Sequence, residues 1–260
     1  MREHGFVTKD SVVIVTGAGG GIGSATALKL ASLGMTVVTV DKNESQLSAT
    51  TKRIADAGFK SVAIAADVTS EDDCKKVCNA ASTLGLPLKG LVNNAAVGAF
   101  NMSVEQTSLD EWNRIIAINL TSLFLMSKYA LPHIREAGGG AIINVSSVHA
   151  YATSTGVAPY AAAKGGVLAL TRTMALDLAK DKIRVICLAP GAVNTPMLQQ
   201  HADREGKTLA ELGFPAGSSD IARIAYPAEL ADTISFALSK EATFITGSAI
   251  VADGGLLAKF

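Results

Sequence analysis

The sequence predicts an α/β fold in which one doubly wound parallel sheet of about seven strands is flanked by helices. Three observations predict it. Short runs rich in Val, Ile and Ala recur along the chain, segments with helical spacing separate them, and the runs show little polar alternation. Because a strand that follows a helix returns parallel to the strand before it, this alternation favours a parallel sheet. No linker or repeat interrupts it, so we expect a single domain over residues 1–260.

The expected strands are the apolar runs at residues 12–15, 36–40, 61–66, 90–93, 141–145, 183–188 and 248–252. The expected helices have apolar residues at helical spacing and lie at 24–33, 44–57, 71–84, 109–134, 159–179 and 227–238. One segment, 195–224, is polar and Gly-rich and departs from the alternation. A long insertion of this kind is typical of a substrate lid, which we predict here, and a plain surface loop is the alternative.

Composition and charge exclude several classes of protein. The 260 residues are 48% hydrophobic and carry 23 Lys and Arg against 23 Asp and Glu, so the formal net charge is zero. Since this balance provides no basic surface for a phosphate backbone, we expect no nucleic-acid partner. The apolar runs are short and interrupted, and the first residues lack the apolar core of a signal peptide. We therefore expect a soluble, cytoplasmic protein without a membrane partner.

The cysteines indicate neither a disulfide framework nor a metal site. The chain has three, Cys74, Cys78 and Cys187, which are too few and too scattered for a framework. Cys74 and Cys78 would share a helix face, but no His or second Cys pair completes a set of metal ligands. We expect reduced thiols and no bound metal.

A glycine-rich stretch, TGAGGGIG at residues 16–23, joins the first expected strand to the first expected helix. Gly17, Gly21 and Gly23 permit a sharp turn, a close approach of backbone N–H groups to a pyrophosphate, and tight packing of helix on sheet. A glycine loop alone is weak evidence, because a plain tight turn has the same composition. Asp41 strengthens it, since it ends the second strand twenty positions after Gly21. Together they predict a Rossmann-type dinucleotide site.

Asp41 also favours NAD over NADP. A carboxylate at this position accepts hydrogen bonds from the hydroxyls of the adenine ribose and repels a 2′-phosphate. Lys42, the next residue, offers a cation that would weaken this preference. The alternative role for Asp41 is to cap the following helix, which Asn43 or Ser45 can do instead.

The run SSVHAYATSTGVAPYAAAKGG, residues 146–166, contains a phenol and an ammonium four positions apart. The three alanines between them are strong helix formers, so Tyr160 and Lys164 share one helix face. A free phenol has a pKa of about 10, and a nearby ammonium favours its ionised form, which is a base. Without the other motifs, an ordinary amphipathic helix that turns its aromatic residue inward and its charge outward would explain Tyr160 and Lys164 equally well. His149, just after the serines, either lines a substrate pocket or belongs only to a loop.

Together these motifs resemble the short-chain dehydrogenase/reductase (SDR) family over residues 11–256. The resemblance is carried by TGAGGGIG, ADV (66–68), NNAA (93–96), Asn119 in IAINL, INVSS (143–147), YAAAK (160–164), PGAVNTPM (190–197) and the final ITG and VADGG. It implies a catalytic set of Asn119, Ser147, Tyr160 and Lys164. Ser147 is chosen over Ser146 because the family serine lies thirteen residues before the tyrosine. Ala96 stands where the family commonly has Gly, which puts nothing important in doubt.

The resemblance also implies which residues meet the cofactor. Asp67 and Val68 match the pair at the adenine ring, Asn94 matches a residue that contacts a ribose and steadies the sheet, and Val193 and Thr195 match positions at the nicotinamide carboxamide. The whole implied cofactor-binding set is Gly17, Gly21, Ile22, Gly23, Asp41, Asp67, Val68, Asn94, Tyr160, Lys164, Val193 and Thr195. Asn119 is expected to anchor a water that relays protons to Lys164.

We therefore expect an NAD-dependent oxidoreductase that transfers a hydride between a nicotinamide and a secondary alcohol or ketone, with sugars, polyols and hydroxy acids as possible substrates. Tyr160 would move the hydroxyl proton, and Ser147 would stabilise the substrate oxygen. The alternatives are a catalytically silent NAD-binding sensor or scaffold of the same fold, and a related enzyme of dehydration or epimerisation. The resemblance implies a homotetramer paired through the helices at 109–134 and 159–179.

Overall fold

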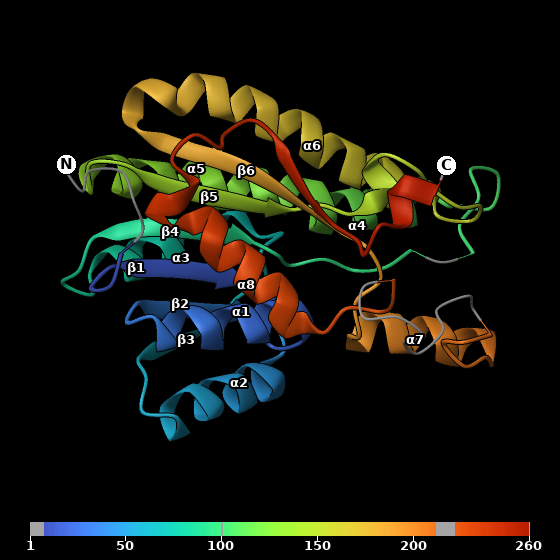
Figure 1. Ribbon diagram of the computed structural model, residues 1–260, viewed down its shortest axis with the longest axis horizontal. Coiled ribbons are helices and arrows are strands. Elements are labelled where there is room, and N and C mark those ends of the chain that lie inside the picture. Colours follow the sequence, from blue (N-terminus) through green and yellow to red (C-terminus); the bar gives the residue numbers. More distant parts are fainter. Residues whose placement is uncertain (1–7, 100, 212–221, 260) are drawn as a thin grey trace.

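The computed structural model describes residues 8–99, 101–211 and 222–259, and a parallel sheet of seven strands forms its centre (Figure 1). The strands are β1 Val12–Thr16, β2 Thr36–Asp41, β3 Ser61–Ala65, β4 Leu88–Asn93, β5 Gly140–Val145, β6 Ile183–Pro190 and β7 Ala249–Ala252. Their order in the sheet is β3-β2-β1-β4-β5-β6-β7, and every neighbouring pair is parallel. The predicted fold class and all seven predicted strands are confirmed.

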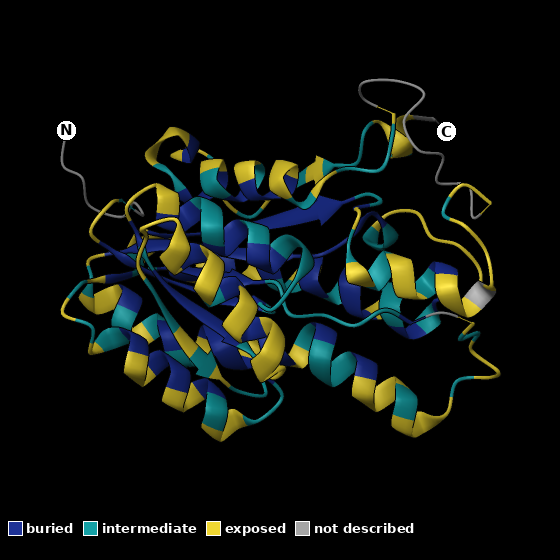
Figure 2. Ribbon diagram, turned by 90° about the horizontal axis from the view of Figure 1, so that it is seen from below, coloured by how far each residue is buried: buried dark blue, intermediate teal, exposed yellow. Residues whose placement is uncertain are grey.

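Helices cover both faces of the sheet. They are α1 Gly21–Ser32, α2 Glu44–Asp56, α3 Glu71–Ser82, α4 Leu109–Ile116, α5 Ser122–Glu136, α6 Ala158–Leu178, α7 Pro196–Glu205 and α8 Pro227–Leu238. Side chains of α1, α2 and α8 form one hydrophobic core with the sheet, and side chains of α3, α5 and α6 form another. Figure 2 shows the result as buried strands between helices whose outer faces are exposed.

The central strand β1 shows why the apolar runs lack polar alternation. Val13 and Val15 point into the core under α1, α2 and α8, whereas Val12 and Ile14 point into the core under α3, α5 and α6. All four side chains are fully buried. Because successive side chains of a strand point to opposite faces, a strand covered on both sides must be apolar at every position.

The segment 195–224 differs from the irregular loop that its composition suggests, because it contains α7. Thr195 caps this helix by accepting a hydrogen bond from the backbone N–H of Leu198, and Pro196 occupies its first position. Gly206 ends it in the left-handed conformation, with φ +61°. Ala202 is buried, while most other described residues of α7 are not, so no apolar stripe revealed the helix. Residues 212–221 of the predicted lid lie outside the described residues.

The expected helix at 109–134 is α4 and α5 joined by a π-helical turn, Ala117–Thr121. This stretch, Leu109–Glu136, is the one helix in the described part of the chain that is long and apolar enough to cross a membrane, which the broken apolar runs did not predict. A core helix of a soluble protein passes the same test, and 44% of the apolar window is buried inside the protein. Its side chains Leu125, Met126 and Ala130 pack in the hydrophobic core.

Candidate active site

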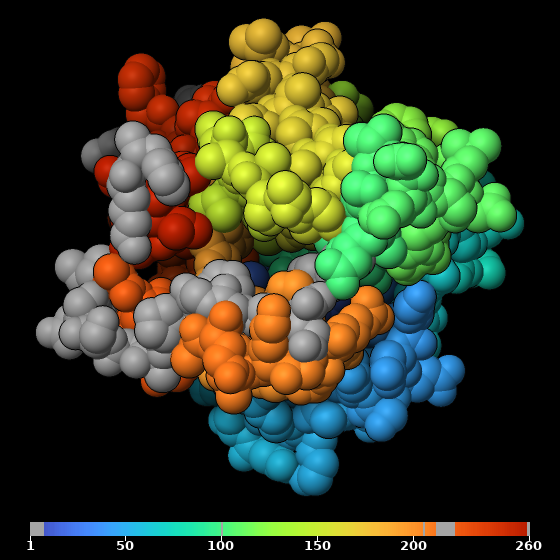
Figure 3. Space-filling view, turned by 90° about the vertical axis from the view of Figure 1, so that its right-hand side faces the viewer, coloured from blue at the N-terminus to red at the C-terminus, as the bar shows by residue number. Residues whose placement is uncertain are grey.

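The predicted site residues gather at the carboxyl ends of the strands. The glycine loop follows β1, Asp41 ends β2, Asp67 and Val68 follow β3, Asn94 follows β4, Ser147 follows β5, and Val193 and Thr195 follow β6. The strand order reverses between β1 and β4, and in such sheets ligands bind outside the carboxyl ends at this point. Figure 3 looks onto this edge and shows a hollow between α7, in orange, and the segment near residue 150, in yellow-green.

The glycine loop leaves the first turn of α1 open to an anion. Gly17 has φ +63°, and a Cβ at Gly23 would lie 2.1 Å from the Gly17 carbonyl oxygen, so neither position accepts a side chain. The N-terminal positions of α2, α3, α4 and α7 are capped by side chains, but the N-cap residue of α1 is Gly20, and no described side chain caps this helix. Its backbone N–H groups therefore fit the pyrophosphate of a dinucleotide.

Asp41 lies beside this loop as a fixed carboxylate. One oxygen accepts a hydrogen bond from the backbone N–H of Gly19 at 2.9 Å, and the other accepts one from the backbone N–H of Asn43 at 2.9 Å. The cap of α2 is Asn43, whose side chain accepts from the Gln46 N–H at 3.1 Å. The alternative role of Asp41 as the cap is therefore wrong, and its carboxylate faces the glycine loop.

Asn94 ties the end of β4 to the end of β1. Its Nδ2 donates to the carbonyl oxygens of Thr16 at 2.9 Å and Gly17 at 3.2 Å. In return, the Thr16 hydroxyl oxygen accepts from the backbone N–H groups of Asn94 and Ala95, at 3.0 and 3.1 Å. These bonds hold the glycine loop against the strand at the switch point, as the expected role in steadying the sheet requires.

Asp67, at the end of β3, is also a held carboxylate. It accepts hydrogen bonds from the backbone N–H of Thr69 at 2.9 Å and from the Thr69 hydroxyl at 2.7 Å. Although burial acts to raise its pKa, these two bonds and the positive charge of Lys42 lower the pKa below the ordinary value. Lys42 thus lies near enough to Asp67 for its charge to act there.

Thr195 brings the start of α7 next to the start of α1. A Cβ at Gly21 would lie 3.0 Å from Cγ2 of Thr195, so the two segments are nearly in contact. Val193 is buried and forms an isolated parallel bridge with Ala225, and the N–H of Asn194 donates to the Ala225 carbonyl at 2.9 Å. The segment after β6 is therefore held in place before α7 begins.

The two serines after β5 have different partners. The Ser146 hydroxyl donates to the backbone carbonyl of Lys164 at 2.8 Å and is buried. Ser147 accepts a hydrogen bond from the backbone N–H of His149 at 3.2 Å, and it lies close enough to Tyr160 to act on the pKa of that phenol. Ser146 therefore anchors α6, while Ser147 lies beside the phenol.

Tyr160 and Lys164 lie one turn apart on α6, with Lys164 Nζ 5.6 Å from the centroid of the Tyr160 ring. Lys164 is 2% exposed and donates to the Val145 carbonyl at 3.0 Å, and burial lowers its pKa to about 8. Burial raises the pKa of Tyr160, against the opposing effect of the Ser147 hydrogen bond. Lys164 together with the positive ring of an oxidised nicotinamide is expected to favour the phenolate, and this effect of the bound cofactor stays a prediction.

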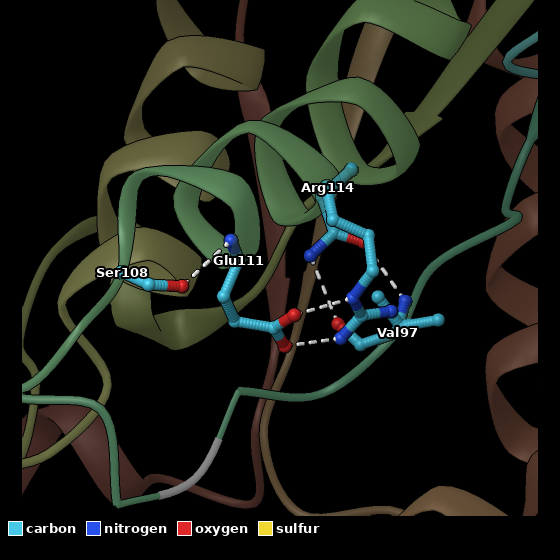
Figure 4. A network of polar contacts seen from close by, with 5 residues as sticks. Val97, Ser108, Glu111 and Arg114 are labelled. Carbon is cyan, nitrogen blue, oxygen red and sulfur yellow. Dashed lines mark hydrogen bonds and ion pairs between the residues drawn. The ribbon is translucent and has the colours of Figure 1, made fainter.

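Asn119 lies fully buried in the π-helical turn, at the break that the resemblance implied. Its Oδ1 accepts from the backbone N–H of Val97 at 2.8 Å, and its Nδ2 donates to the Val97 carbonyl at 2.9 Å. Both ends of the amide are thus occupied by the loop after β4, which passes close to α4 (Figure 4). The amide keeps one further donor and one further acceptor position, and the water that Asn119 is expected to anchor stays a prediction.

Hydrogen bonds between backbone groups join two loops that border the site. The Met102 N–H donates to the Gly156 carbonyl at 2.7 Å, and the Ala158 N–H donates to the Met102 carbonyl at 3.1 Å. Met102 and Val157 form an isolated parallel bridge. Sequence reasoning missed this clamp because the two segments are far apart in the chain, and the only local signal is Gly156, whose φ is +75°.

α7 lies across from α4 at the opening of the site. Glu111 of α4, whose N-terminus is capped by Ser108, forms a two-point ion pair with Arg114 (Figure 4). The hydrogen bonds from Arg114 lower the pKa of Glu111, and the charge of Arg204 on α7 lowers it further. The positive charge of Arg204 on the predicted lid therefore lowers the pKa of a carboxyl group on α4.

No metal site accompanies this arrangement within the described residues, since no three His, Cys, Asp or Glu side chains gather there. Cys74, Cys78 and Cys187 are all free and buried. Burial raises the pKa of the Cys187 thiol to about 11, so it is protonated beside Lys164 and adds no negative charge near neutral pH.

The strand order, the open glycine loop and the cluster of Ser147, Tyr160 and Lys164 define a Rossmann-type dehydrogenase or reductase. The model of the family described as short chain dehydrogenase matches residues 11–206. The chain belongs to this family, and it is an oxidoreductase that acts on alcohol or ketone groups.

Three relatives are similar along nearly their whole length. A cyclohexanol dehydrogenase of Acinetobacter sp. (strain SE19) is 36% identical over 251 residues, which cover 96% of this chain and 96% of the relative. The cis-4-hydroxycyclohexanecarboxylate dehydrogenase of Sinomonas cyclohexanicum is 36% identical over 96% of this chain and 97% of its own. A cyclopentanol dehydrogenase of Comamonas testosteroni is 36% identical, covering 96% and 98%. Among solved structures, levodione reductase aligns with a TM-score of 0.90 and 29% identity, over 98% of this chain and 100% of that one.

Proposed function

We propose that this protein is an NAD-dependent dehydrogenase that interconverts a carbocyclic secondary alcohol and its ketone. The observation that carries the proposal is the cluster of Ser147, Tyr160 and buried Lys164 beside a glycine loop whose helix N-terminus is open. Three relatives with 36% identity support the substrate class, because each is named for a ring that bears a secondary alcohol.

The preference for NAD rests on Asp41. Its carboxylate is held at the glycine loop by two backbone N–H groups and can accept hydrogen bonds from two ribose hydroxyls. A phosphate at the same place would meet this fixed negative charge. Lys42, the next residue, is the cation that would weaken this preference.

In this proposal, the chain's own residues handle the proton, and the bound nicotinamide supplies the hydride acceptor or donor. Tyr160 acts as the phenolate, which the Lys164 ammonium and the positive ring of an oxidised nicotinamide would favour, when it removes the proton of the substrate hydroxyl. In the reverse direction its phenol donates that proton to a ketone. The Ser147 hydroxyl donates a hydrogen bond to the same oxygen and stabilises its developing charge. Asn119 holds the Val97 loop in place and anchors the water of the proton relay.

Lys164 sets the pH range of the reaction. Its pKa of about 8 means that its protonated fraction falls as the pH rises through 8, so it can receive the proton that Tyr160 has taken up. Alcohol oxidation should therefore accelerate as the pH rises through about 8, and ketone reduction should be favoured below it. Because the phenol and the amine exchange a proton, a pKa measured from the pH dependence of the rate belongs to the pair rather than to either group alone.

The test is turnover, followed as NADH absorbance, with a panel of cyclic alcohols, sugars, polyols and hydroxy acids. Tyr160→Phe should abolish activity, and Tyr151→Phe is the matched control because Tyr151 is a 48% exposed tyrosine nine positions away. Near-full activity of Tyr160→Phe would contradict the mechanism. A protein that binds NAD but turns over no substrate would instead be the silent sensor.

We further propose a single-domain, cytoplasmic homotetramer that acts on a small molecule, without a nucleic-acid or membrane partner, and in which α7 belongs to a substrate lid. Three free, buried cysteines suit a reducing compartment. Leu109 and Phe124 on α4 and α5 are 72% and 49% exposed, and Leu176 on α6 is 82% exposed, so both expected pairing helices present apolar side chains. A monomer in light scattering at micromolar concentration would contradict the tetramer.

A further inference from the structure

The His149 side chain contacts the active-site phenol directly. Its ring centroid lies 5.6 Å from that of Tyr160, with an angle of 84° between the ring planes, which is an edge-to-face contact. The backbone N–H of the same residue donates to the Ser147 hydroxyl oxygen at 3.2 Å. His149 therefore contacts Tyr160 through its ring and Ser147 through its backbone N–H, and these are the two residues that would hold the reacting oxygen of the substrate.

The imidazole is also held on its other side. Its Nδ1 lies 2.9 Å from the hydroxyl oxygen of Thr153, so the ring is fixed between Tyr160 and the loop that follows the serines. Burial lowers the pKa of His149 below its ordinary value of 6.5, because the cation loses solvation. At pH 7 the ring is therefore predominantly neutral.

The hydroxyl of Thr153 is the hydrogen-bond partner of His149 Nδ1, at 2.9 Å. Its other neighbouring acceptor, the Ser154 carbonyl at 3.5 Å, is too distant for a good O–H···O hydrogen bond. This geometry fits the tautomer in which the Thr153 hydroxyl donates to Nδ1. A neutral imidazole that accepts at Nδ1 carries its own proton at Nε2. His149 thus offers an N–H donor on the ring edge that Thr153 does not occupy.

We propose that His149 is a specificity-determining residue whose Nε2–H donates a hydrogen bond to a second oxygen on the substrate ring, so that the preferred substrate is a cyclic alcohol bearing a further hydroxyl or carbonyl. This inference rests on the proposed function, because it places a second contact beside the same reacting oxygen. A neutral donor suits an uncharged hydroxyl or carbonyl, and a donor that a bound plain hydrocarbon ring covers and leaves unpaired discriminates against that ring.

The test compares cyclohexanol with the 1,2-, 1,3- and 1,4-cyclohexanediols, using NAD and the full-length protein. We expect the best diol to exceed cyclohexanol in kcat/KM, and His149→Phe to lower the ratio of the two values by about 10- to 100-fold. The loss should appear in KM rather than in kcat, since the second oxygen is remote from the reacting carbon. His149→Gln, which keeps an N–H donor, should recover part of the ratio.

Thr153→Val should lower the same ratio several-fold, because without the Thr153 proton the His149 proton can move to Nδ1. Ser154→Ala is the matched control, as it removes a neighbouring exposed hydroxyl that has no contact with His149. An equal fall of kcat on both substrates in His149→Phe would overturn the inference, because the ring would then only support Tyr160. An unchanged ratio would overturn it as well. Failure of the wild-type protein to oxidise any of the four alcohols would instead refute the proposed function.

Discussion

Replacing Gly23 by Ala tests the glycine loop where the structure leaves least room. The new Cβ would lie 2.1 Å from the Gly17 carbonyl oxygen and 2.6 Å from Nδ2 of Asn94, whereas ordinary contacts begin near 3.4 Å. Neither neighbour can yield freely, because the first is backbone and the second is hydrogen-bonded to the carbonyls of Thr16 and Gly17. The start of α1 must therefore move away from the loop by about 1.3 Å.

This displacement has two measurable consequences. Overpacking of this kind costs about 1–3 kcal/mol, and in a chain of this size each kcal/mol lowers Tm by about 2–4 °C. We therefore expect Gly23→Ala to lower Tm by about 2–12 °C in thermal unfolding. A shift of about 1 Å in the phosphate-binding N–H groups should weaken NAD binding about 100-fold, as measured by titration calorimetry.

Gly20→Ala is the matched control for stability. Gly20 lies in the same loop, but its φ of −164° is extended backbone, and the nearest atom to its Cβ would be Cγ of Pro196 at 3.8 Å. Its Tm should stay close to that of the wild-type protein. A Gly23→Ala variant with the wild-type Tm and the wild-type affinity for NAD would refute the reasoning, because the loop would then be neither tightly packed nor part of the cofactor site.

Three further substitutions test other parts of the molecule. Burial lowers the pKa of Lys164 from its ordinary 10.5 to about 8, so the unfolded chain binds this proton more tightly than the folded protein does. Below pH 8 the buried ammonium therefore lowers the free energy of unfolding by about 3 kcal/mol. Lys164→Met should therefore be inactive yet more stable than the wild type at pH 7 in urea, and the difference should shrink as the pH rises from 8 past 10. Arg184→Met removes three hydrogen bonds from a buried guanidinium to carbonyls at the C-terminal end of α8, and should lower the free energy of unfolding by about 3 kcal/mol. Asp41→Ser removes the fixed carboxylate, and should lower the ratio of kcat/KM with NAD to that with NADP by about 100-fold.

Each substitution has an outcome that would contradict its prediction. A Lys164→Met protein that unfolds more easily than the wild type at pH 7 would mean that burial of the ammonium is not costly. Arg184→Lys should fail to rescue stability, since one ammonium cannot reach three carbonyls, and a full rescue would show that charge alone matters. Lys42→Ala should raise the NAD to NADP ratio only slightly, and a large rise there with no change in Asp41→Ser would assign selectivity to the cation.

The strands and the glycine loop were predictable because their signals are local. Val12 to Val15 are apolar at every position, which only a strand covered on both faces requires. Gly17 and Gly23 stand where a side chain would collide with backbone, so composition alone marks the turn. The cap of α2 was left open between residues of similar propensity, and only the bond from Gln46 to Asn43 distinguishes them.

The electrostatics and the long-range contacts were not predictable, because they depend on burial and on distant segments. In the protein alone, desolvation raises the pKa of Tyr160, and spacing along a helix does not reveal this effect. The Asn119 side chain bonds a loop 22 positions away, and its position in a motif did not indicate that its amide holds this loop. The helix α7 was missed because its polar residues show no apolar stripe.

The backbone clamp at Met102 has a consequence for engineering the enzyme. The N–H and C=O groups of Met102 bond Gly156 and Ala158, so residues 95–102 and 148–157 share one backbone framework. A loop transplanted from a relative into only one of these segments would leave polar groups of the other without their partners. Exchange of substrate preference between members of the family therefore calls for transfer of both segments together, or for side-chain changes that leave this framework intact.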